Sequence, residues 1–259
     1  MALIDSSVPG SFCWMELATT DQNAAKAFYG SLLGWIATDF PMGPGQFYSM
    51  FKLEDRDVAA GYTMMKDEQA LGIPPHWNLY IAVENADAAA TRAAELGGKV
   101  LAPAFDVMDA GRMAVIQDPT GAIFQVWQPA RSIGIHISNV PGAFCWADLN
   151  TPDPGAASAF YSGLLGWKFE LGEHDTSGYL HIRNGASFIG GVPAAEQRDP
   201  NAPPHWMLYF QVADCDASTA KAIALGARTY LPPMTLEGVG RFSVIADPQG
   251  AAFSLFTPA

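Results

Sequence analysis

Hydrophobic residues follow two alternating spacings along this chain, and these spacings predict strands and helices in turn. Phe12 to Leu17 is an apolar run of strand length, followed by a stripe of apolar residues spaced three and four apart. The stripe consists of Ala25, Phe28, Tyr29 and Leu32. This pattern is typical of a helix that packs one face on a sheet. Asp21 can accept the free N–H groups at the start of the helix, and Gly34 ends it.

The same patterns predict the rest of the first half of the chain. Strands are expected at Phe47–Leu53, Val58–Met65, Trp77–Val83, Lys99–Leu101, Arg112–Gln117 and Ile123–Gln128, with a second helix from about Asp87 to Leu96. The order is a strand, a helix and three strands, repeated once. Antiparallel strands with helices on one outer face make an α+β fold.

The second half of the chain repeats the first. The matching segments are Phe12-Cys13-Trp14 with Phe144-Cys145-Trp146, Phe28-Tyr29 with Phe160-Tyr161, Leu33-Gly34-Trp35 with Leu165-Gly166-Trp167, Pro74-Pro75-His76-Trp77 with Pro203-Pro204-His205-Trp206, and Asp118-Pro119 with Asp247-Pro248. The second copy is three residues shorter between its Gly-Trp and Pro-Pro-His-Trp segments. Such a repeat indicates two homologous domains. We place them at residues 1–129 and 142–259, joined by a linker at residues 130–141 that lacks clear periodicity.

Composition narrows the classes of function. The 259 residues are 49% hydrophobic, enough for two cores, and the net charge is −12. An acidic chain repels phosphate backbones and anionic lipids, so we expect a small-molecule ligand and neither nucleic acid nor membrane as a partner. No secretion signal is visible and the three cysteines are typical of reduced core residues, so we expect a cytoplasmic protein. Pairing of modules within one chain suits a monomer, and a homodimer is left open.

The repeated motifs resemble those of a known superfamily. Trp14-x-Glu16-Leu17-x-Thr19-x-Asp21, Phe28-Tyr29-x-x-Leu32-Leu33-Gly34-Trp35 and Asp118-Pro119-Thr120-Gly121 look like the glyoxalase / bleomycin-resistance / extradiol-dioxygenase superfamily, also called vicinal oxygen chelate (VOC). The resemblance covers nearly the whole chain outside the linker, in the tandem two-domain form found in bacteria. It implies two βαβββ modules per domain, forming a curved, cup-like mixed sheet with helices outside. It also implies a small ligand in the cup and, in many members, a divalent metal.

The positions that hold metal ligands in such members carry other residues here. The resemblance places them at Trp14, Asn78 and Gln125 in the first copy, at Trp146, Met207 and Ser254 in the second, and on a further strand at Ala60-Gly61 and Gly190-Gly191. Divalent metals need carboxylate, imidazole or thiolate donors, which these positions do not supply. We therefore expect no metal at the superfamily's positions and no cofactor, with an unconventional divalent site left open.

Strand alternation predicts which other side chains face each cup. A carboxylate and a histidine recur there, as Glu16 with His76 and as Asp148 with His205. Such a pair can transfer protons, since the carboxylate orients the imidazole and raises its pKa, or it can belong to a displaced metal site. The alternative is that both histidines are structural and bond a backbone carbonyl in the Pro-Pro-His-Trp turn.

Aromatic side chains fall on the same register. The predicted ligand-binding set is Trp14, Asn78, Tyr80, Gln125 and Trp127 in the first cup, and Trp146, Met207, Tyr209, Ser254 and Phe256 in the second. Aromatic walls suit flat or apolar ligands, although the same rings can simply fill a core. Two arginines, Arg112 and Arg241, are either clamps for an anionic ligand group or salt-bridge partners of Asp118 and Asp247.

These patterns leave three hypotheses for function. The leading one is a small-molecule binding protein without the superfamily's metal ligands, which takes an apolar or aromatic molecule in an aromatic-lined cup. Its main rival is an enzyme of the glyoxalase, lyase or hydroxylase type that uses Glu16/His76 or Asp148/His205 as an acid–base pair or as unconventional metal ligands. The third is a scaffold whose cups are filled by their own side chains. An open cavity in a cup favours the first hypothesis, and its absence favours the third.

Overall fold

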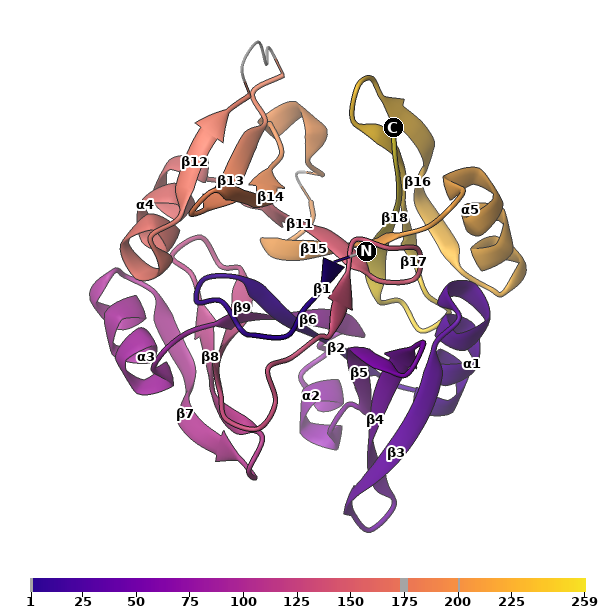
Figure 1. Ribbon diagram of the computed structural model, residues 1–259, viewed down its shortest axis with the longest axis horizontal. Helices are drawn as coiled ribbons and strands as arrows, with labels where there is room; N and C mark the ends of the chain where they lie inside the picture. The colour runs from indigo at the N-terminus through magenta and orange to yellow at the C-terminus, as the bar shows by residue number, and fades with distance from the viewer. Residues whose placement is uncertain (1, 173–176, 200) are drawn as a thin grey trace.

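The computed structural model describes residues 2–172, 177–199 and 201–259. These residues form two eight-stranded sheets, one from each half of the chain, and a small two-stranded sheet (Figure 1). Both large sheets mix parallel and antiparallel neighbours, and helices cover one face of each. The predicted α+β class and the four βαβββ modules are therefore confirmed.

The first domain contains β2 (Phe12–Thr19), α1 (Gln22–Leu33), β3 (Ile36–Gly43), β4 (Gln46–Leu53), β5 (Arg56–Thr63), α2 (Lys66–Ala70), β6 (His76–Ala82), α3 (Ala86–Glu95), β7 (Lys99–Val107), β8 (Gly111–Gln117) and β9 (Ile123–Pro129). The second contains β11 (Phe144–Asn150), α4 (Pro154–Leu165), β12 (Lys168–Leu171), β13 (Leu180–Asn184), β14 (Ser187–Val192), the short 3₁₀ helix η1 (Ala195–Gln197), β15 (His205–Gln211), α5 (Cys215–Ala224), β16 (Arg228–Leu236), β17 (Gly240–Ala246) and β18 (Ala252–Pro258). The strand orders are β3-β4-β5-β2-β6-β9-β8-β7 and β12-β13-β14-β11-β15-β18-β17-β16. The two modules of each domain thus meet where β2 pairs with β6 and where β11 pairs with β15.

The first helix of each domain starts and stops at the residues that the sequence marks. The carboxylate of Asp21 accepts the Ala24 N–H at 2.9 Å, and Asp153 caps α4 by accepting the Ala156 N–H at 2.9 Å. Gly34 ends α1 with φ of +78°, in the left-handed region where a residue without Cβ has no steric cost.

The repeated motifs join the two domains. Tyr29 of the first Phe-Tyr motif donates its hydroxyl hydrogen to Asp247 of the second Asp-Pro-x-Gly motif at 3.0 Å. The reciprocal bond runs from Tyr161 to Asp118 at 3.1 Å. Each tyrosine oxygen also accepts an indole N–H, from Trp77 and Trp206 respectively, both at 3.1 Å. The Gly-Trp motifs add bonds from Trp35 to the Gly142 carbonyl at 2.6 Å and from Trp167 to the Gly10 carbonyl at 2.8 Å.

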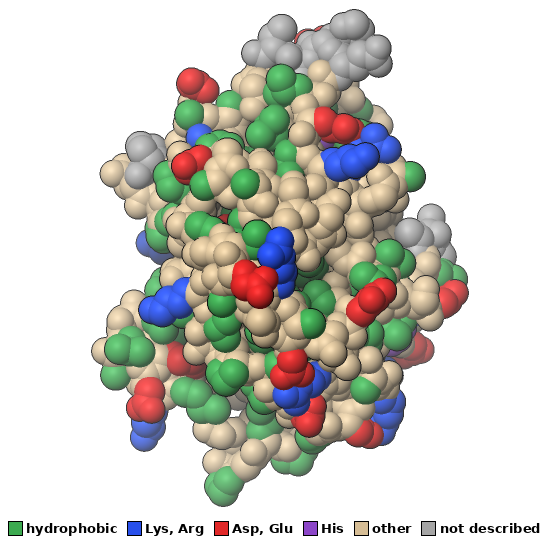
Figure 2. Space-filling view, turned by 90° about the vertical axis from the view of Figure 1, so that its left-hand side faces the viewer, with side chains coloured by type: hydrophobic (Ala, Val, Ile, Leu, Met, Phe, Trp, Pro, Cys, Tyr) green, Lys and Arg blue, Asp and Glu red, His purple; other side chains and the backbone are tan. Residues whose placement is uncertain are grey.

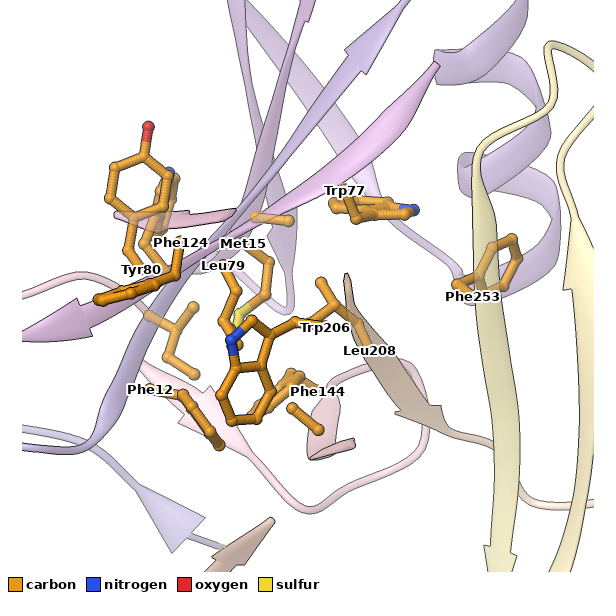
Figure 3. Close-up of a cluster of buried hydrophobic side chains, with 14 of the residues drawn as sticks. Phe12, Met15, Trp77, Leu79, Tyr80, Phe124, Phe144, Trp206, Leu208 and Phe253 are labelled. Atoms are coloured by element: carbon orange, nitrogen blue, oxygen red, sulfur yellow. The ribbon is translucent and has the colours of Figure 1, made fainter. Parts of the chain in front are cut away.

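An apolar cluster at the centre of the molecule continues across both domains (Figure 3). The Phe12 ring lies 6.0 Å from the Phe144 ring, its repeat counterpart, and 5.3 Å from the Trp206 ring, measured between centroids. Helices pair on either side of this cluster, with α1 against α5 and α3 against α4 (Figure 1). The two domains therefore share one continuous core.

Three features differ from the sequence-based prediction. The predicted order of three strands after the first helix requires β3, but the sequence patterns assign this strand no range, because nearly all its side chains are exposed and its apolar residues show no buried face. Strand β7 extends well beyond the predicted Lys99–Leu101. The linker is ordered: its Ile137–Ser138 (β10) pairs with Ala2–Leu3 (β1), and the Ile135 N–H donates to the Cys13 carbonyl at 2.8 Å.

The cysteines are free thiols, as expected. Within the described ranges, no helix is both long and apolar enough to cross a membrane.

Candidate functional site: two carboxyl–tyrosine clusters

Each sheet leaves one face uncovered by the long helices, and the two uncovered faces point away from each other (Figure 1). We call the side chains on these faces cup 1 and cup 2. Cup 1 comprises Trp14, Glu16, Tyr48, Met50, Tyr62, Asn78, Tyr80, Gln125 and Trp127. Cup 2 comprises Trp146, Asp148, Tyr179, His181, Met207, Tyr209, Ser254 and Phe256.

Strand register brings the predicted ligand-binding residues onto these faces. Glu16 on β2 lies opposite Asn78 on β6, and Trp14 lies opposite Tyr80. Tyr80 in turn lies beside Gln125 on β9. In the second domain Asp148 lies opposite Met207, Trp146 opposite Tyr209, and Tyr209 beside Ser254. Residues that are opposite one another on neighbouring strands present their side chains on the same side of the sheet.

A buried glutamate forms the centre of cup 1. The side chain of Glu16 accepts the Tyr48 hydroxyl at 2.7 Å on Oε1 and the Tyr80 hydroxyl at 2.9 Å on Oε2. Tyr48 itself accepts the indole N–H of Trp14 at 3.0 Å. Burial raises the pKa of Glu16, and the two tyrosine bonds oppose that increase by favouring the charged form.

Cup 2 contains the same cluster built around a shorter acid. Asp148 accepts the Tyr179 hydroxyl at 2.6 Å and the Tyr209 hydroxyl at 2.7 Å, one on each oxygen. The Trp146 indole N–H is shared between the Tyr179 hydroxyl at 2.8 Å and Asp148 at 3.1 Å. Burial raises the pKa of Asp148 in the same way. Both domains thus hold one desolvated carboxyl under two tyrosines and a tryptophan.

The surroundings of the two carboxyls differ. In cup 1, Met50 lies opposite Ala60, which lies opposite Glu16. In cup 2 the corresponding row is His181, Gly191 and Asp148. A Cβ at Gly191 would collide with the Tyr179 hydroxyl group, so the glycine makes room for this tyrosine. The Asn78–Gln125 hydrogen bond of cup 1, at 2.8 Å, is replaced by Met207 and Ser254.

The two predicted histidines bond elsewhere. His76 lies opposite Ala18, at the start of β6, and its Nδ1 is 2.8 Å from the Pro74 carbonyl oxygen. His205 repeats this arrangement with the Pro203 carbonyl at 2.8 Å. Since a carbonyl only accepts, each Nδ1 is the donor. The structure therefore brings together the predicted carboxyls and aromatic rings, while each imidazole bonds to its own turn.

Donor chemistry at the superfamily's metal positions does not fit a divalent ion. The positions are occupied by indole, amide, thioether and hydroxyl groups, and each cup brings a single carboxyl to its centre. Among the described residues, no three His, Cys, Asp or Glu side chains form a group that could hold a metal. A zinc or manganese site needs at least three such donors.

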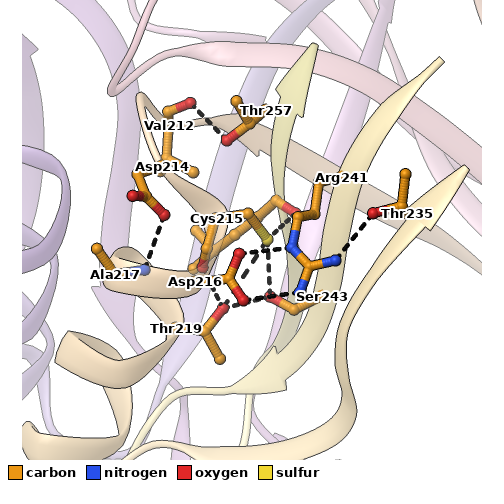
Figure 4. Close-up of polar contacts among 11 residues, drawn as sticks. Val212, Asp214, Cys215, Asp216, Ala217, Thr219, Thr235, Arg241, Ser243 and Thr257 are labelled. Atoms are coloured by element: carbon orange, nitrogen blue, oxygen red, sulfur yellow. Dashed lines mark hydrogen bonds and ion pairs between the residues drawn. The ribbon is translucent and has the colours of Figure 1, made fainter. Parts of the chain in front are cut away.

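The two arginines have partners other than those predicted. Arg112 bonds Asp87 at 2.8 Å and Asp106 at 2.8 Å, and not Asp118. Arg241 bonds Asp216 at 2.7 Å and Thr235 at 2.9 Å, next to a small network of Cys215, Thr219 and Ser243 (Figure 4). The prediction of salt bridges to Asp118 and Asp247 is wrong, because these aspartates bond the tyrosines of the opposite domain.

Sequence comparison of the repeats missed Tyr48 and Tyr179. The second copy is one residue shorter between its Gly-Trp motif and Tyr179, so the tyrosines fall out of alignment with the preceding motif. The other two missing residues fall in the segment between the fourth strand and Pro-Pro-His-Trp. That segment forms α2 in the first domain, where Glu68 accepts the Tyr62 hydroxyl at 3.3 Å, and the shorter η1 in the second.

Two cavities among the described residues lie away from both carboxyls, since neither is lined by Glu16 or Asp148. One, of about 340 Å³, lies between the domains and is lined by Gly10, Asn85, Arg92 and Leu165, among others. It belongs to the side where α3 meets α4, on which acidic and basic side chains are interspersed (Figure 2). The other, of about 400 Å³, adjoins η1 and is lined by Thr151, Arg198 and Pro204. Neither of these two cavities lies in a cup, which favours the scaffold hypothesis, whereas the partial exposure of Tyr48, Tyr62 and Asn78 favours the binding one.

Family models match both halves of the chain. Residues 11–126 match the model described as "Glyoxalase/Bleomycin resistance protein/Dioxygenase superfamily". Residues 146–256 match the model described as "Glyoxalase-like domain". The matched ranges correspond to the two sheets.

Two groups of full-length relatives are similar to this chain. "Putative glyoxylase CFP32" of Mycobacterium bovis is 44% identical over 248 residues, which is 95% of this chain and 94% of that protein. "Anthracycline biosynthesis protein DnrV" of Streptomyces peucetius is 34% identical over 263 residues, covering 95% and 93%.

Solved structures share the fold at low sequence identity. The Mn(II)-bound glyoxalase from Novosphingobium aromaticivorans superimposes with a TM-score of 0.66 at 17% identity, covering 97% of this chain and 83% of that one. The 2,3-dioxygenase LapB from Pseudomonas sp. KL28 superimposes with a TM-score of 0.63 at 13% identity, covering 98% and 93%. These likenesses concern the fold alone.

Proposed function

Because the chain belongs to the glyoxalase/bleomycin resistance protein/dioxygenase superfamily, we propose that it binds a small, flat, largely apolar molecule in its cups. The ligand lies against the aromatic rings around Glu16 and Asp148. The observation that carries this proposal is the pair of carboxyl–tyrosine clusters, each set on an uncovered sheet face among indole and phenol rings.

Buried carboxyl–tyrosine bonds alone do not mark a ligand site, since Asp118 and Asp247 make them at the domain interface. The clusters in the cups differ because they lie on sheet faces that the long helices leave uncovered. Burying a carboxyl costs free energy, and an apolar side chain of similar volume often stabilises a core as well or better. Small-molecule sites, in contrast, combine apolar and aromatic walls with a few convergent polar groups that fix the orientation of the ligand. Both cups have this composition, and the partial exposure of Tyr48 and Asn78 keeps the surface of cup 1 accessible.

The relatives are consistent with a small-molecule role. One group is named for anthracycline biosynthesis, and the other is named as a glyoxylase. The donor sets in the cups do not fit a metal, so recognition rests on ring stacking and on hydrogen bonds from side chains.

A second candidate function is acid–base catalysis, favoured by one observation. A carboxyl whose pKa is raised by burial stands at the centre of cup 1, where Glu16 is bonded by the Tyr48 and Tyr80 hydroxyls. In that case Glu16→Gln abolishes turnover of a bound substrate while leaving its dissociation constant nearly unchanged. If the protein only binds its ligand, there is no turnover for this substitution to abolish.

Thermal-shift screening with planar aromatic compounds tests the binding proposal. A ligand present at 100 times its dissociation constant stabilises the folded state by about 2.7 kcal/mol, which raises the melting temperature by several degrees. Trp14→Ala and Trp146→Ala should each remove the shift from one cup. Ile223→Ala, at an exposed site on α5, serves as the control that keeps both. Failure of every planar compound to shift the wild-type protein contradicts the proposal.

A further inference from the structure

Cup 2 carries one titratable side chain that cup 1 lacks. His181 on β13 occupies the position that Met50 occupies on β4, two strands away from the central carboxyl in each case. Its ring lies 5.0 Å from the Tyr179 ring, centroid to centroid, and the Tyr179 hydroxyl donates to Asp148. The imidazole is therefore part of the polar centre of cup 2.

The Nδ1 atom of His181 is buried and has no hydrogen-bond partner among the described residues. Leaving a buried polar atom unpaired costs about 1–3 kcal/mol, so such atoms are uncommon unless a ligand or water completes them. Cup 2 thus presents an unused polar atom in addition to its satisfied carboxyl cluster.

An aromatic ring and a cation stand next to this imidazole. The Phe188 ring lies 5.3 Å from the His181 ring and 5.4 Å from the Arg183 guanidinium, and it is 52% exposed. An exposed phenylalanine is a surface for stacking, and the adjacent positive charge favours an electron-rich oxygen beside it. Arg183 bonds Glu170 at 3.1 Å through Nη1, and its buried Nε, which can only donate, has no partner among the described residues. The unpaired atom beside the ring that is able to accept a hydrogen bond is Nδ1 of His181.

We propose that cup 2 selects aromatic molecules that carry a hydroxyl group, which donates its hydrogen to Nδ1 of His181 while the ring stacks on Phe188. This proposal rests on the proposed function and narrows it to one cup and one ligand class. In the neutral tautomer that carries its hydrogen on Nε2, Nδ1 is an acceptor, and a phenolic hydroxyl supplies the donor for it. Cup 1 lacks this imidazole, since Met50 stands at its position and a thioether is only a weak acceptor. The unpaired acceptor of cup 1, Gln125 Oε1, lies on β9, on the other side of the central strands.

Calorimetric titration with three naphthalenes tests the proposal. The probes are 2-naphthol, 2-methoxynaphthalene, which has the same ring without the donor, and 2-naphthoate, which carries an anion. Wild-type protein should bind 2-naphthol in cup 2 about tenfold more tightly than 2-methoxynaphthalene, since one hydrogen bond contributes about a factor of ten. 2-Naphthoate should bind no more tightly than 2-naphthol, because Asp148 lies close by.

A residue exchange between the cups supplies matched variants. His181→Met places the cup 1 residue in cup 2 and should weaken 2-naphthol binding about tenfold without changing that of 2-methoxynaphthalene. Met50→His is the control, and it should leave the cup 2 site unchanged. Thermal melts establish that each variant is folded, and the comparison of probes on wild-type protein needs no variant.

The outcomes separate this proposal from the broader one. Equal binding of 2-naphthol and 2-methoxynaphthalene, or an unchanged affinity in His181→Met, overturns the hydroxyl selection and leaves aromatic binding standing. Tighter binding of 2-naphthoate than of 2-naphthol also overturns it, in favour of a carboxylate. Absence of binding by all three probes counts against both proposals.

Discussion

The seven tryptophans divide into two sets that behave differently under duplication. The interface set is Trp35, Trp77, Trp167 and Trp206, and the cup set is Trp14, Trp127 and Trp146. In the interface set each tryptophan has a counterpart with the same partner: Trp35 and Trp167 donate to glycine carbonyls of the opposite domain, and Trp77 and Trp206 donate to tyrosines. In the cup set Trp127 has no tryptophan counterpart, because Phe256 stands in its place.

This difference shows what the repeat encodes. The Phe-Tyr, Gly-Trp, Pro-Pro-His-Trp and Asp-Pro-x-Gly motifs supply the reciprocal contacts between domains, so they are constrained as pairs. The cups keep one carboxyl and its tyrosines, and the residues around that centre have diverged, from Met50 to His181 and from Asn78 to Met207. The shared motifs therefore describe the scaffold, and the differences lie in the cups, where we propose that the ligand binds.

The largest loss of stability is expected from substitutions of tryptophans at the domain interface. Trp167→Ala removes a side chain that is 1% exposed and its bond to Gly10, and should lower the free energy of unfolding by about 3–5 kcal/mol. Trp35→Ala should lower the free energy of unfolding by a similar amount, because Trp35 makes the equivalent contacts in the first domain. Urea denaturation measures both, with Ile223→Ala expected within about 0.5 kcal/mol of wild type. A loss below about 1 kcal/mol in either tryptophan variant would break the comparison.

Removing a tyrosine–aspartate hydrogen bond between the domains should give the next largest loss of stability. Tyr29→Phe leaves the Trp77 indole N–H and one oxygen of Asp247 without their partner, at a cost of about 1–3 kcal/mol. Tyr161→Phe should cost the same amount, since it removes the reciprocal bonds. Thermal denaturation of the two variants side by side checks this. Clearly unequal losses would mean that the two halves of the interface are not equivalent.

The buried carboxyl of cup 1 predicts a pH dependence. Burial raises the pKa of Glu16 above its usual value near 4.3, so the folded state holds this proton more tightly than the unfolded state. Stability from this group is therefore fully present below the usual pKa and is lost as pH rises through the raised one. Relative to Glu16→Gln, which does not titrate, the wild-type free energy of unfolding should fall as pH rises from about 4 to 8. A flat difference, measured by denaturation at each pH, contradicts a raised pKa.

The smallest change in stability is expected when a divalent metal is added. Because the cups lack three suitable donors, an excess of Mn²⁺ or Zn²⁺ should shift the melting temperature by no more than about 1 °C. His76→Ala is the matched control for an unconventional site. A stoichiometric metal that is retained by the wild-type protein and lost from this variant would overturn the assignment of the histidine to its turn.

The fold could be predicted from the sequence because the patterns that specify its helices and strands are local. The caps at Asp21 and Gly34, the helical stripe through Phe28, and the strand periodicity each lie within a few residues. The partners of Tyr29 and Trp35 were out of reach, since they lie in the other domain and no local spacing relates them. The candidate site could be predicted only in part. Strand alternation placed Glu16 and Trp14 on the same face of the sheet, but a one-residue difference in length between the copies kept Tyr48 from being recognised.

Indole N–H signals in a nitrogen-15 NMR spectrum test the central claim most directly, because each tryptophan reports on its own region. On titration with 2-naphthol, the signals of Trp14, Trp127 or Trp146 should shift, while those of Trp35, Trp77, Trp167 and Trp206 stay in place. Shifts confined to the interface set would contradict the account, because they would place the ligand between the domains instead of in the cups.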